Sequence, residues 1–479
     1  MLSRFVSRGC GSGGVFRHCL SGLRPYSSGR IYRPDGTSSC VREELTPLGR
    51  HIRDMILATG PISVAKFMQL ALTSPVGGYY TQGKDVFGRS GDFVTSPEIS
   101  QMFGEIMAVW YVLHWEILGR PAKTALVELG PGKGTLMDDM LRSARRFPNF
   151  LATVQEVHLV ERSPELRRVQ HAKLGCEWTR TQTTGDKNDQ DKTPVSSTTR
   201  NGVRVYWHDM LEEVEMYDGC VPLVMAHEFF DALPIYRFEK GHNNMWHEIL
   251  VDVAGDASTD PSRNISLGST TKDSETVEDS LNFKYVRSRE VTANAALLLR
   301  DKRFETRFDK GDLIEVSPES ARIMSQLADL ISHGGGAGLV IDYGQDWTQG
   351  DTFRGIKHHK FAHPLGSPGS MDLTADVDFS FLRLAAKDKA QCYGPVEQGS
   401  FLHAMGIQAR LQQLLQSTRD AKMQKNLVDC YKRLTDPHSM GRIYKVLSVL
   451  PKSSACVPVP FAPTPQEELN KPKVEKIVK

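Results

Sequence analysis

Short β-rich runs, separated in part by helical patterns, are the feature that most constrains the fold of this chain. Each run is largely apolar, as strands are when helices cover both faces of a parallel sheet. We therefore expect an α/β protein built on a doubly wound sheet. The runs are Ala125 to Leu129, Val157 to Val160, Val203 to Trp207, Val221 to Met225 and Leu339 to Ile341.

Helical patterns dominate the region before these runs. Three sites carry the Ser, Thr or Pro residues that are typical of helix starts, and each is followed by periodic apolar residues. They are Thr46-Pro47, Ser63 and Ser96-Pro97, and the apolar pattern after the third site is long. Two later polar stretches lack periodicity and are interpreted as surface insertions. The predicted organisation is a helical N-terminal portion over 31–122, an α/β domain over 123–450 with polar insertions at 181–201 and 254–280, and a mobile tail over 451–479.

The first thirty residues have the composition of a targeting segment. They contain five arginines and six serines but no acidic residue and no lysine. This bias is typical of a mitochondrial transit peptide, and no long apolar segment suggests a secretory signal instead. We predict a transit peptide over residues 1–30 and a location in the mitochondrial matrix, with a disordered basic tail as the alternative.

Charge and cysteine content exclude several classes of partner. The 59 Lys and Arg residues nearly balance the 57 Asp and Glu residues, so the chain lacks the excess of positive charge that nucleic-acid binding requires. No apolar run approaches the roughly 18 residues of a membrane-spanning helix, so no integral membrane segment is expected. The eight cysteines form no C-x-x-C pair, and we predict no metal site.

A glycine-rich segment follows the first β-rich run, where doubly wound folds bind their ligands. It contains Gly130, Gly132 and Gly134 in a G-x-G-x-G spacing, with Glu128 at the end of the run. The dinucleotide motif has a different spacing, and a carboxylate suits a cation better than a pyrophosphate. S-adenosylmethionine carries a sulfonium, an ammonium and a carboxylate, so the segment predicts a site for this cofactor.

Two further acidic residues stand at the ends of later runs. Glu161 follows the second run and is suited to accept hydrogen bonds from both hydroxyls of an adenosine ribose. Asp209 follows the third run and is suited to accept a hydrogen bond from an adenine amino group. Each feature alone also fits an ordinary turn, but the three occur in the order that a donor site requires.

The sequence resembles class I S-adenosylmethionine-dependent methyltransferases. It more closely resembles the MidA-like family of mitochondrial protein arginine methyltransferases, which act in the assembly of respiratory complex I. The resemblance spans residues 60 to about 450, and the unusual residue within it is His227, where a small amide is expected. The matching blocks are 60–63, 77–80, 91–100, 128–135, 228–234 and 341–344.

The resemblance implies a class I methyltransferase-like sheet and an enzyme that dimethylates an arginine of a complex I core subunit symmetrically, as a type II enzyme does. Glu228 and Asp231 follow the fourth run, so they are expected at the carboxyl edge of the sheet beside the donor. A pair of carboxylates would align the guanidinium and offset its charge. Alternatively, both acids only cap a helix or brace Tyr236 and Arg237.

Some alternatives remain open at this point. Asp342 either touches the substrate or begins a turn, and the turn is the preferred interpretation. The block over residues 91–100 forms either part of a lid or a rigid loop. A non-catalytic assembly chaperone with a methyltransferase fold is the main alternative function. A nicotinamide-dependent oxidoreductase is disfavoured by the glycine spacing and by Glu128.

Overall fold

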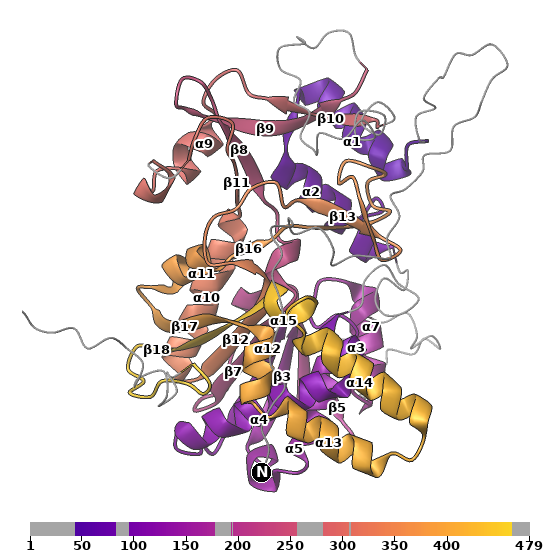
Figure 1. The fold of residues 1–479 in the computed structure, drawn as a ribbon, viewed down its shortest axis with the longest axis vertical. Coiled ribbons are helices and arrows are strands. Elements are labelled where there is room, and N and C mark those ends of the chain that lie inside the picture. The colour runs from indigo at the N-terminus through magenta and orange to yellow at the C-terminus, as the bar shows by residue number, and fades with distance from the viewer. Residues whose placement is uncertain are drawn as a thin grey trace, which may run out of the picture.

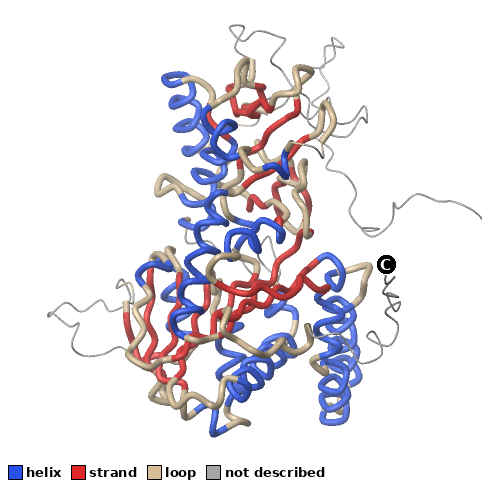
Figure 2. The backbone as a smooth tube through the Cα atoms, turned by 90° about the vertical axis from the view of Figure 1, so that its left-hand side faces the viewer, coloured by secondary structure: helices blue, strands red, loops and turns tan. Residues whose placement is uncertain are grey.

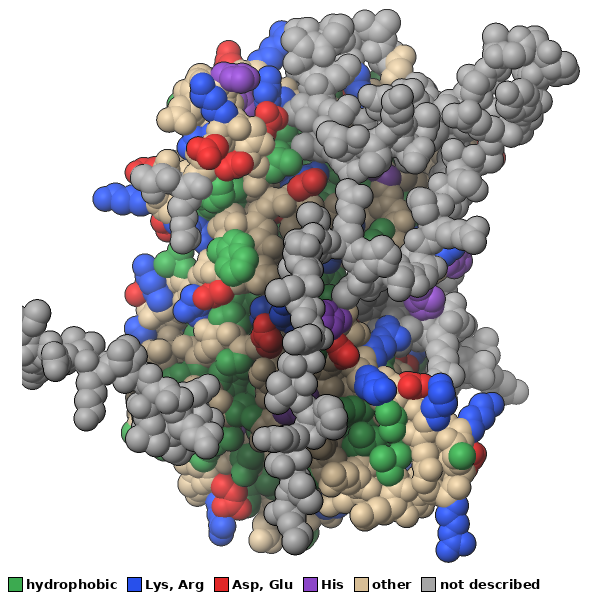
Figure 3. Space-filling model, in the orientation of Figure 1, with side chains coloured by type: hydrophobic (Ala, Val, Ile, Leu, Met, Phe, Trp, Pro, Cys, Tyr) green, Lys and Arg blue, Asp and Glu red, His purple; other side chains and the backbone are tan. Residues whose placement is uncertain are grey.

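The computed structural model describes residues 44–82, 95–177, 193, 195–255, 281–305 and 308–461. The predicted transit peptide, residues 91–94 of the suggested lid, and most of both predicted polar insertions lie outside these ranges. The described residues form a larger α/β unit and a smaller unit above it (Figure 1). On the face drawn in Figure 3, basic and acidic side chains are interspersed, and neither sign forms a separate patch.

The larger unit is built on a mixed sheet whose central strands are parallel, which confirms the predicted fold class. The strand order is β17-β18-β12-β7-β2-β3-β6-β5-β4. The central parallel strands are β12 (Ala337–Gln345), β7 (Val221–His227), β2 (Thr124–Leu129), β3 (Val154–Val160) and β6 (Arg204–His208). The remaining strands are β4 (Cys176–Glu177), β5 (Ser196–Thr199), β17 (Ala390–Glu397), the antiparallel β18 (Tyr444–Pro451) and the short β16 (Val377–Asp378), which pairs with β12 outside this order.

Helices cover both faces of this sheet (Figure 2). In β2, Leu126 belongs to one hydrophobic cluster and Val127 to another, because successive side chains of a strand point to opposite faces. The first cluster includes residues of α4 (Gln101–Ile117), α5 (Thr135–Ala144), α12 (Gln398–Ala404), α13 (Ile407–Ser417) and α14 (Ala421–Thr435). The second includes residues of α10 (Pro318–Gly334) and α11 (Phe379–Ala386).

The smaller unit contains an antiparallel sheet that the sequence analysis did not predict. Its strands are β1 (Ile62–Ser63), β8 (Tyr236–Lys240), β9 (Trp246–Val253), β10 (Phe283–Arg287) and β11 (Leu313–Val316). Helices α1 (Pro47–Thr59) and α2 (Val64–Thr73) pack against this sheet through a shared hydrophobic cluster. Both helices are capped as predicted, since the side chains of Thr46 and Ser63 accept hydrogen bonds from the first turns.

The long helix predicted from Ser96 is interrupted in the structure. Residues Ser96–Ile99 form the short helix α3, and Ser100 then adopts an extended conformation with φ −159° and ψ 135°. The hydroxyl of Ser100 accepts a hydrogen bond from the Met102 amide and so starts α4 as a separate helix. The prediction was wrong because a serine between two apolar stretches can cap a new helix as readily as it can continue one.

Two other segments differ from their predicted character. Residues 196–199 were assigned to a polar insertion, but they form β5, which pairs with β6 at the edge of the large sheet. Residues 452–461 belong to the predicted tail, and there the Val459 carbonyl accepts a hydrogen bond from the indole of Trp110. Residues 462–479 lie outside the described ranges. Among the described residues, no helix is both long enough and apolar enough to cross a membrane.

Candidate active site

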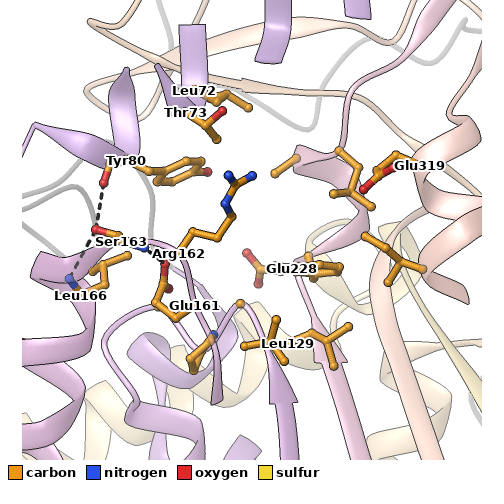
Figure 4. A pocket seen from close by; sticks show the side chains of 18 of the residues that line it. Leu72, Thr73, Tyr80, Leu129, Glu161, Arg162, Ser163, Leu166, Glu228 and Glu319 are labelled. Carbon is orange, nitrogen blue, oxygen red and sulfur yellow. Dashed lines mark hydrogen bonds between the residues drawn. The ribbon is translucent and has the colours of Figure 1, made fainter. Parts of the chain in front are cut away.

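A cavity of about 980 Å³ opens at the carboxyl ends of β2, β3, β6 and β7. The chain passes from β2 to β3 on one side and later returns to β7 on the other side of β2, so this is the point at which the strand order reverses. Doubly wound proteins bind their ligands in the crevice at such a point. Residues of α2, α3 and α10 complete the walls, and Glu161 and Glu228 point into the cavity (Figure 4).

Six of the eight predicted site residues line this cavity. They are Glu128, Gly130, Gly132, Glu161, Asp209 and Glu228. Gly134 lies two residues after Gly132, at the N-cap position of α5. Asp231 is buried and is not among the lining residues. The structure therefore places five of the six predicted donor residues around one cavity, but only one of the two predicted acceptor acids lies on its wall.

The glycine segment has a backbone that other residues rarely adopt. Gly130, Gly132 and Gly134 have φ values of 63°, 52° and 77°. A Cβ atom added to Gly130 would lie 2.8 Å from the Phe229 ring, which is too close for any real contact. Glycine at these positions both permits the left-handed conformation and leaves the backbone open to a ligand.

Glu128 is a buried carboxyl group with an unsatisfied atom. Its side chain lies at the end of β2, and the Oε2 atom has no hydrogen-bond partner among the described residues. Burial raises the pKa of Glu128 to about 8, because the charged form loses its hydration. A cationic ligand such as an ammonium group would provide the missing partner, so this residue fits the proposed donor.

Two residues of α7 (Pro164–Lys173) contact the predicted donor residues, and the sequence analysis missed both. Arg167 donates from Nε to the Glu161 carbonyl at 2.7 Å and from its guanidinium to Asp209 at 2.5 Å. Gln170 donates to the Gly132 carbonyl at 2.7 Å and accepts from the Trp207 indole at 2.9 Å. Arg167 and Gln170 are three residues apart, so both side chains lie on one face of the helix. This spacing can be recognised in the sequence and could have indicated that both residues face the same site.

Glu161 accepts a hydrogen bond of 2.8 Å from the Ser163 amide, and burial raises its pKa to about 7. Asp209 differs from Glu161, because its side chain is 62% exposed and is already paired with Arg167. The structure therefore offers Glu161 as the better-ordered acceptor for a ribose diol, with Asp209 at the more open end of the cavity.

Glu228 has the strained conformation that is common at functional sites. It follows β7 directly and has φ 48°, which is unusual for a residue with a side chain. Its Oε1 atom accepts a hydrogen bond of 3.1 Å from the Ser96 amide, and its Oε2 atom is buried without a hydrogen-bond partner among the described residues. Burial and the nearby Asp231 raise the pKa of Glu228 well above its usual value.

His227, which the sequence analysis noted as an unusual residue, is buried next to Glu228. Its Nε2 atom lies 3.3 Å from Glu228 Oε1, and its ring packs against Phe103 with the ring centres 4.9 Å apart. Burial lowers the pKa of His227 to about 3, so the imidazole is neutral at physiological pH. It therefore adds no positive charge to the acidic end of the cavity.

Asp231 and Asp342 lie behind the cavity and organise the turn that carries Glu228. Asp231 accepts hydrogen bonds from the hydroxyls of Tyr343 and Thr374. Asp342 accepts three backbone hydrogen bonds of 3.0 to 3.3 Å from the amides of residues 229–231. The preferred interpretation, in which Asp342 begins a turn, is wrong, because Asp342 lies within β12. It instead braces the turn formed by residues 229–231.

The alternative in which the acids brace Arg237 is not what the structure shows. Arg237 instead pairs with Glu315 at 3.1 Å and with Asp351 at 2.8 Å, within the smaller unit. The forked pair expected from Glu228 and Asp231 is also not formed at the cavity, because only Glu228 reaches its wall. The reason is that Asp231 lies in a one-turn 3₁₀ helix that directs its carboxylate toward Tyr343.

Comparison with known proteins agrees with this geometry. A family model described as an S-adenosyl-L-methionine-dependent methyltransferase matches residues 106–396. The crystal structure of a protein from Burkholderia thailandensis bound to S-adenosyl-homocysteine has a TM-score of 0.63 to this chain. It is 24% identical in sequence, and the match covers 84% of this chain and 91% of that one. This likeness shows a shared fold.

Relatives with higher identity define the family more narrowly. The Danio rerio protein named "Protein arginine methyltransferase NDUFAF7, mitochondrial" is 41% identical over 404 residues, which cover 84% of this chain and 86% of the relative. The Homo sapiens protein of the same name is 38% identical over 408 residues, covering 85% and 84%. The chain therefore belongs to the family of S-adenosyl-L-methionine-dependent methyltransferases that contains the NDUFAF7 protein arginine methyltransferases.

Proposed function

We propose that this protein is a mitochondrial protein arginine methyltransferase whose acceptor is held by Glu228. The observation that carries the proposal is that Glu228 lines the same cavity as the predicted donor residues, and that its buried Oε2 atom has no hydrogen-bond partner in the part of the chain that the structure describes. An arginine side chain stays protonated at any physiological pH, and a carboxylate is the group that best orients its fork of N–H donors. The names of the relatives support arginine as the acceptor.

In this proposal the donor lies across the carboxyl ends of β2, β3 and β6. Glu128 and the amides of the glycine segment hold its amino-acid end, Glu161 holds the ribose, and Asp209 lies beside the adenine. S-adenosylmethionine supplies an electrophilic methyl group when it is bound. The protein's own contribution is to fix donor and acceptor in line, since well-oriented reactants reach effective molarities of about 10⁵ M or more.

We further propose that the acceptor is an arginine of a complex I core subunit, that the product is symmetrically dimethylated, and that the enzyme acts in the mitochondrial matrix during complex I assembly. The MidA-like sequence blocks support the substrate and the setting. The relatives' names support the mitochondrial location, as does the Arg-rich and Ser-rich segment over residues 1–30.

The test is to incubate the purified protein with methyl-labelled donor and a mitochondrial matrix extract, and then to identify labelled peptides by mass spectrometry. Symmetric dimethylarginine in a complex I core subunit is the expected product. Label on a lysine, on a small molecule or on unrelated proteins would contradict the proposed acceptor. A sample of the same extract without the enzyme controls for endogenous methyltransferases.

Affinity for S-adenosylhomocysteine is expected to rise between pH 6 and pH 8. The pKa values of Glu128 and Glu161 are about 8 and about 7 without ligand, and a cationic amino group beside Glu128 favours its ionised form. Binding therefore releases a proton, and affinity increases by up to about tenfold per pH unit below the ligand-free pKa. Calorimetry in two buffers of different ionisation enthalpy measures the proton release. Retention of the full pH dependence in Glu128→Gln would contradict this assignment.

Replacing Arg167 by alanine is expected to weaken S-adenosylhomocysteine binding by about tenfold. The change removes the hydrogen bonds that hold the Glu161 carbonyl and the Asp209 carboxylate, so both loops lose their fixed positions. Titration calorimetry measures the effect. The matched control is Arg168→Ala on the neighbouring position of the same helix, whose guanidinium pairs with Glu165 at the surface, and this change should leave the affinity within about twofold.

A further inference from the structure

The short helix α3 contacts the residues of both halves of the site. On the acceptor side, the Ser96 amide donates a hydrogen bond of 3.1 Å to Glu228 Oε1, and the Ser96 hydroxyl lies 3.5 Å from the same atom. Ser96 is fully buried, so water does not compete for these contacts. The carboxylate that we assign to the acceptor is thus held in place from α3.

On the donor side, α3 contacts the helix that follows the glycine segment. Glu98 Oε1 accepts a short hydrogen bond from the hydroxyl of Thr135. Thr135 is the first residue of α5 and comes directly after Gly134, and both Glu98 and Thr135 line the cavity. Ser96 and Glu98 are only two residues apart in α3. Ser96 contacts Glu228, and Glu98 contacts Thr135, which follows the glycine segment.

The far end of α3 is anchored to the rest of the larger unit. The Ile99 carbonyl accepts a hydrogen bond of 3.1 Å from Cys430 Sγ on α14, and Ser100 caps α4. Helix α4 in turn packs closely against α5, since a Cβ atom added to Gly104 would lie 2.5 Å from Asp139. The carboxyl end of α3 is therefore fixed to the larger unit through α14 and α4.

We propose that α3 is a strut, formed by residues 96–99, that couples the donor half of the site to the acceptor half. Ser96 and Glu98 are positioning residues, because they act through Glu228 and Thr135. Occupation of the glycine segment fixes Thr135, which fixes Glu98 and α3, and α3 then holds Glu228 in its strained conformation toward the acceptor. The inference rests on the proposed function for the identity of Glu228 as the acceptor acid.

Coupling of this kind is reciprocal, because a binding free energy shared between two sites must appear at both. A substitution of Glu228 should therefore alter the affinity of the donor site for S-adenosylhomocysteine. A second substitution that removes the contact between α3 and Thr135 should abolish this effect. The acceptor protein is not needed for such a measurement. Titration calorimetry with S-adenosylhomocysteine alone reports on the coupling.

The experiment is a double-mutant cycle of Glu228→Ala and Thr135→Val in the full-length protein. Valine is close in shape to threonine but lacks the hydroxyl that Glu98 accepts. Each single change is expected to weaken the affinity for S-adenosylhomocysteine. In the double variant, the fold-loss in affinity is expected to be smaller than the product of the two single fold-losses, by a factor of roughly three to ten. Thr135→Ser retains the hydroxyl, and the effect of Glu228→Ala in that background should equal its effect in the wild type.

Glu98 distinguishes the strut from a direct influence across the cavity. In a Glu98→Ala background the coupling between positions 135 and 228 should vanish, whereas Glu98→Gln, whose side-chain oxygen still accepts the hydrogen bond, should preserve it. Two outcomes would overturn the strut: coupling between positions 135 and 228 that persists in the Glu98→Ala background, or a double-variant loss of affinity that equals the product of the single losses within about twofold. Neither outcome would contradict the proposed activity. Wild-type protein that fails to bind S-adenosylhomocysteine would instead contradict the donor site. Far-ultraviolet circular dichroism verifies that each variant is folded.

Discussion

Replacing Glu228 by glutamine is expected to lower kcat for arginine methylation by about 10²-fold or more. Glutamine can still accept the hydrogen bond from the Ser96 amide, so the local fold should persist. What is lost is the negative charge that Glu228 acquires when the acceptor guanidinium binds, which orients the guanidinium and balances its charge. The measurement is single-turnover transfer of labelled methyl groups to the acceptor identified by mass spectrometry, at saturating donor.

Asp231→Asn is the matched comparison for this variant. Asp231 is buried behind the cavity, where it accepts hydrogen bonds from Tyr343 and Thr374, so its loss should reduce kcat by only about tenfold through a shift of the turn. Equal losses for both variants would favour the forked pair of carboxylates over Glu228 alone. Wild-type kcat in Glu228→Gln would reject the acceptor site.

The same variant tests the alternative function. A non-catalytic assembly chaperone with a methyltransferase fold would support complex I assembly without methyl transfer. Suppose that cells carrying only the Glu228→Gln variant assemble complex I normally although the acceptor stays unmethylated. Assembly then does not require methyl transfer, and the chaperone alternative is supported. Loss of both together is the outcome that the proposed function predicts.

Replacing Gly132 by valine is expected to weaken S-adenosylhomocysteine binding by roughly 100-fold or more. Gly132 has φ 52°, a conformation that a β-branched residue adopts only with strain, and it lines the cavity where the ligand must approach the backbone. The chain must either change its conformation there or place two methyl groups in the ligand's space. Titration calorimetry measures the loss, and far-ultraviolet circular dichroism should remain close to that of the wild type.

Gly202→Val is the control for the strain itself. Gly202 also has a positive φ, 83°, but it lies in the turn between β5 and β6, and an added Cβ atom would meet nothing within 4 Å. This variant should be destabilised by a similar backbone penalty while it keeps its affinity for the ligand. A comparable loss of binding in both variants would mean that Gly132 acts through general stability and not through contact with the donor.

Much of the architecture was predictable from the local pattern. The runs at 125–129, 157–160 and 221–225 all lie in central strands of the sheet, because strands buried on both faces must be apolar throughout. The antiparallel sheet of the smaller unit was missed. Its strands interleave polar and apolar residues, and one of its edges comes from β1, a two-residue strand nearly 190 residues away in sequence from its partner β9.

By itself the sequence determined that acidic residues follow strands and that glycines follow β2, since both depend on the order of residues along the chain. Only the tertiary structure decided which of these groups meet. It directs Glu228 into the cavity and Asp231 away from it, it pairs Asp209 with Arg167, and it places Glu98 against Thr135. The physical reason is that a side chain's partner, burial and charge state depend on segments that are far apart in sequence and meet only when the sheet and its helices pack.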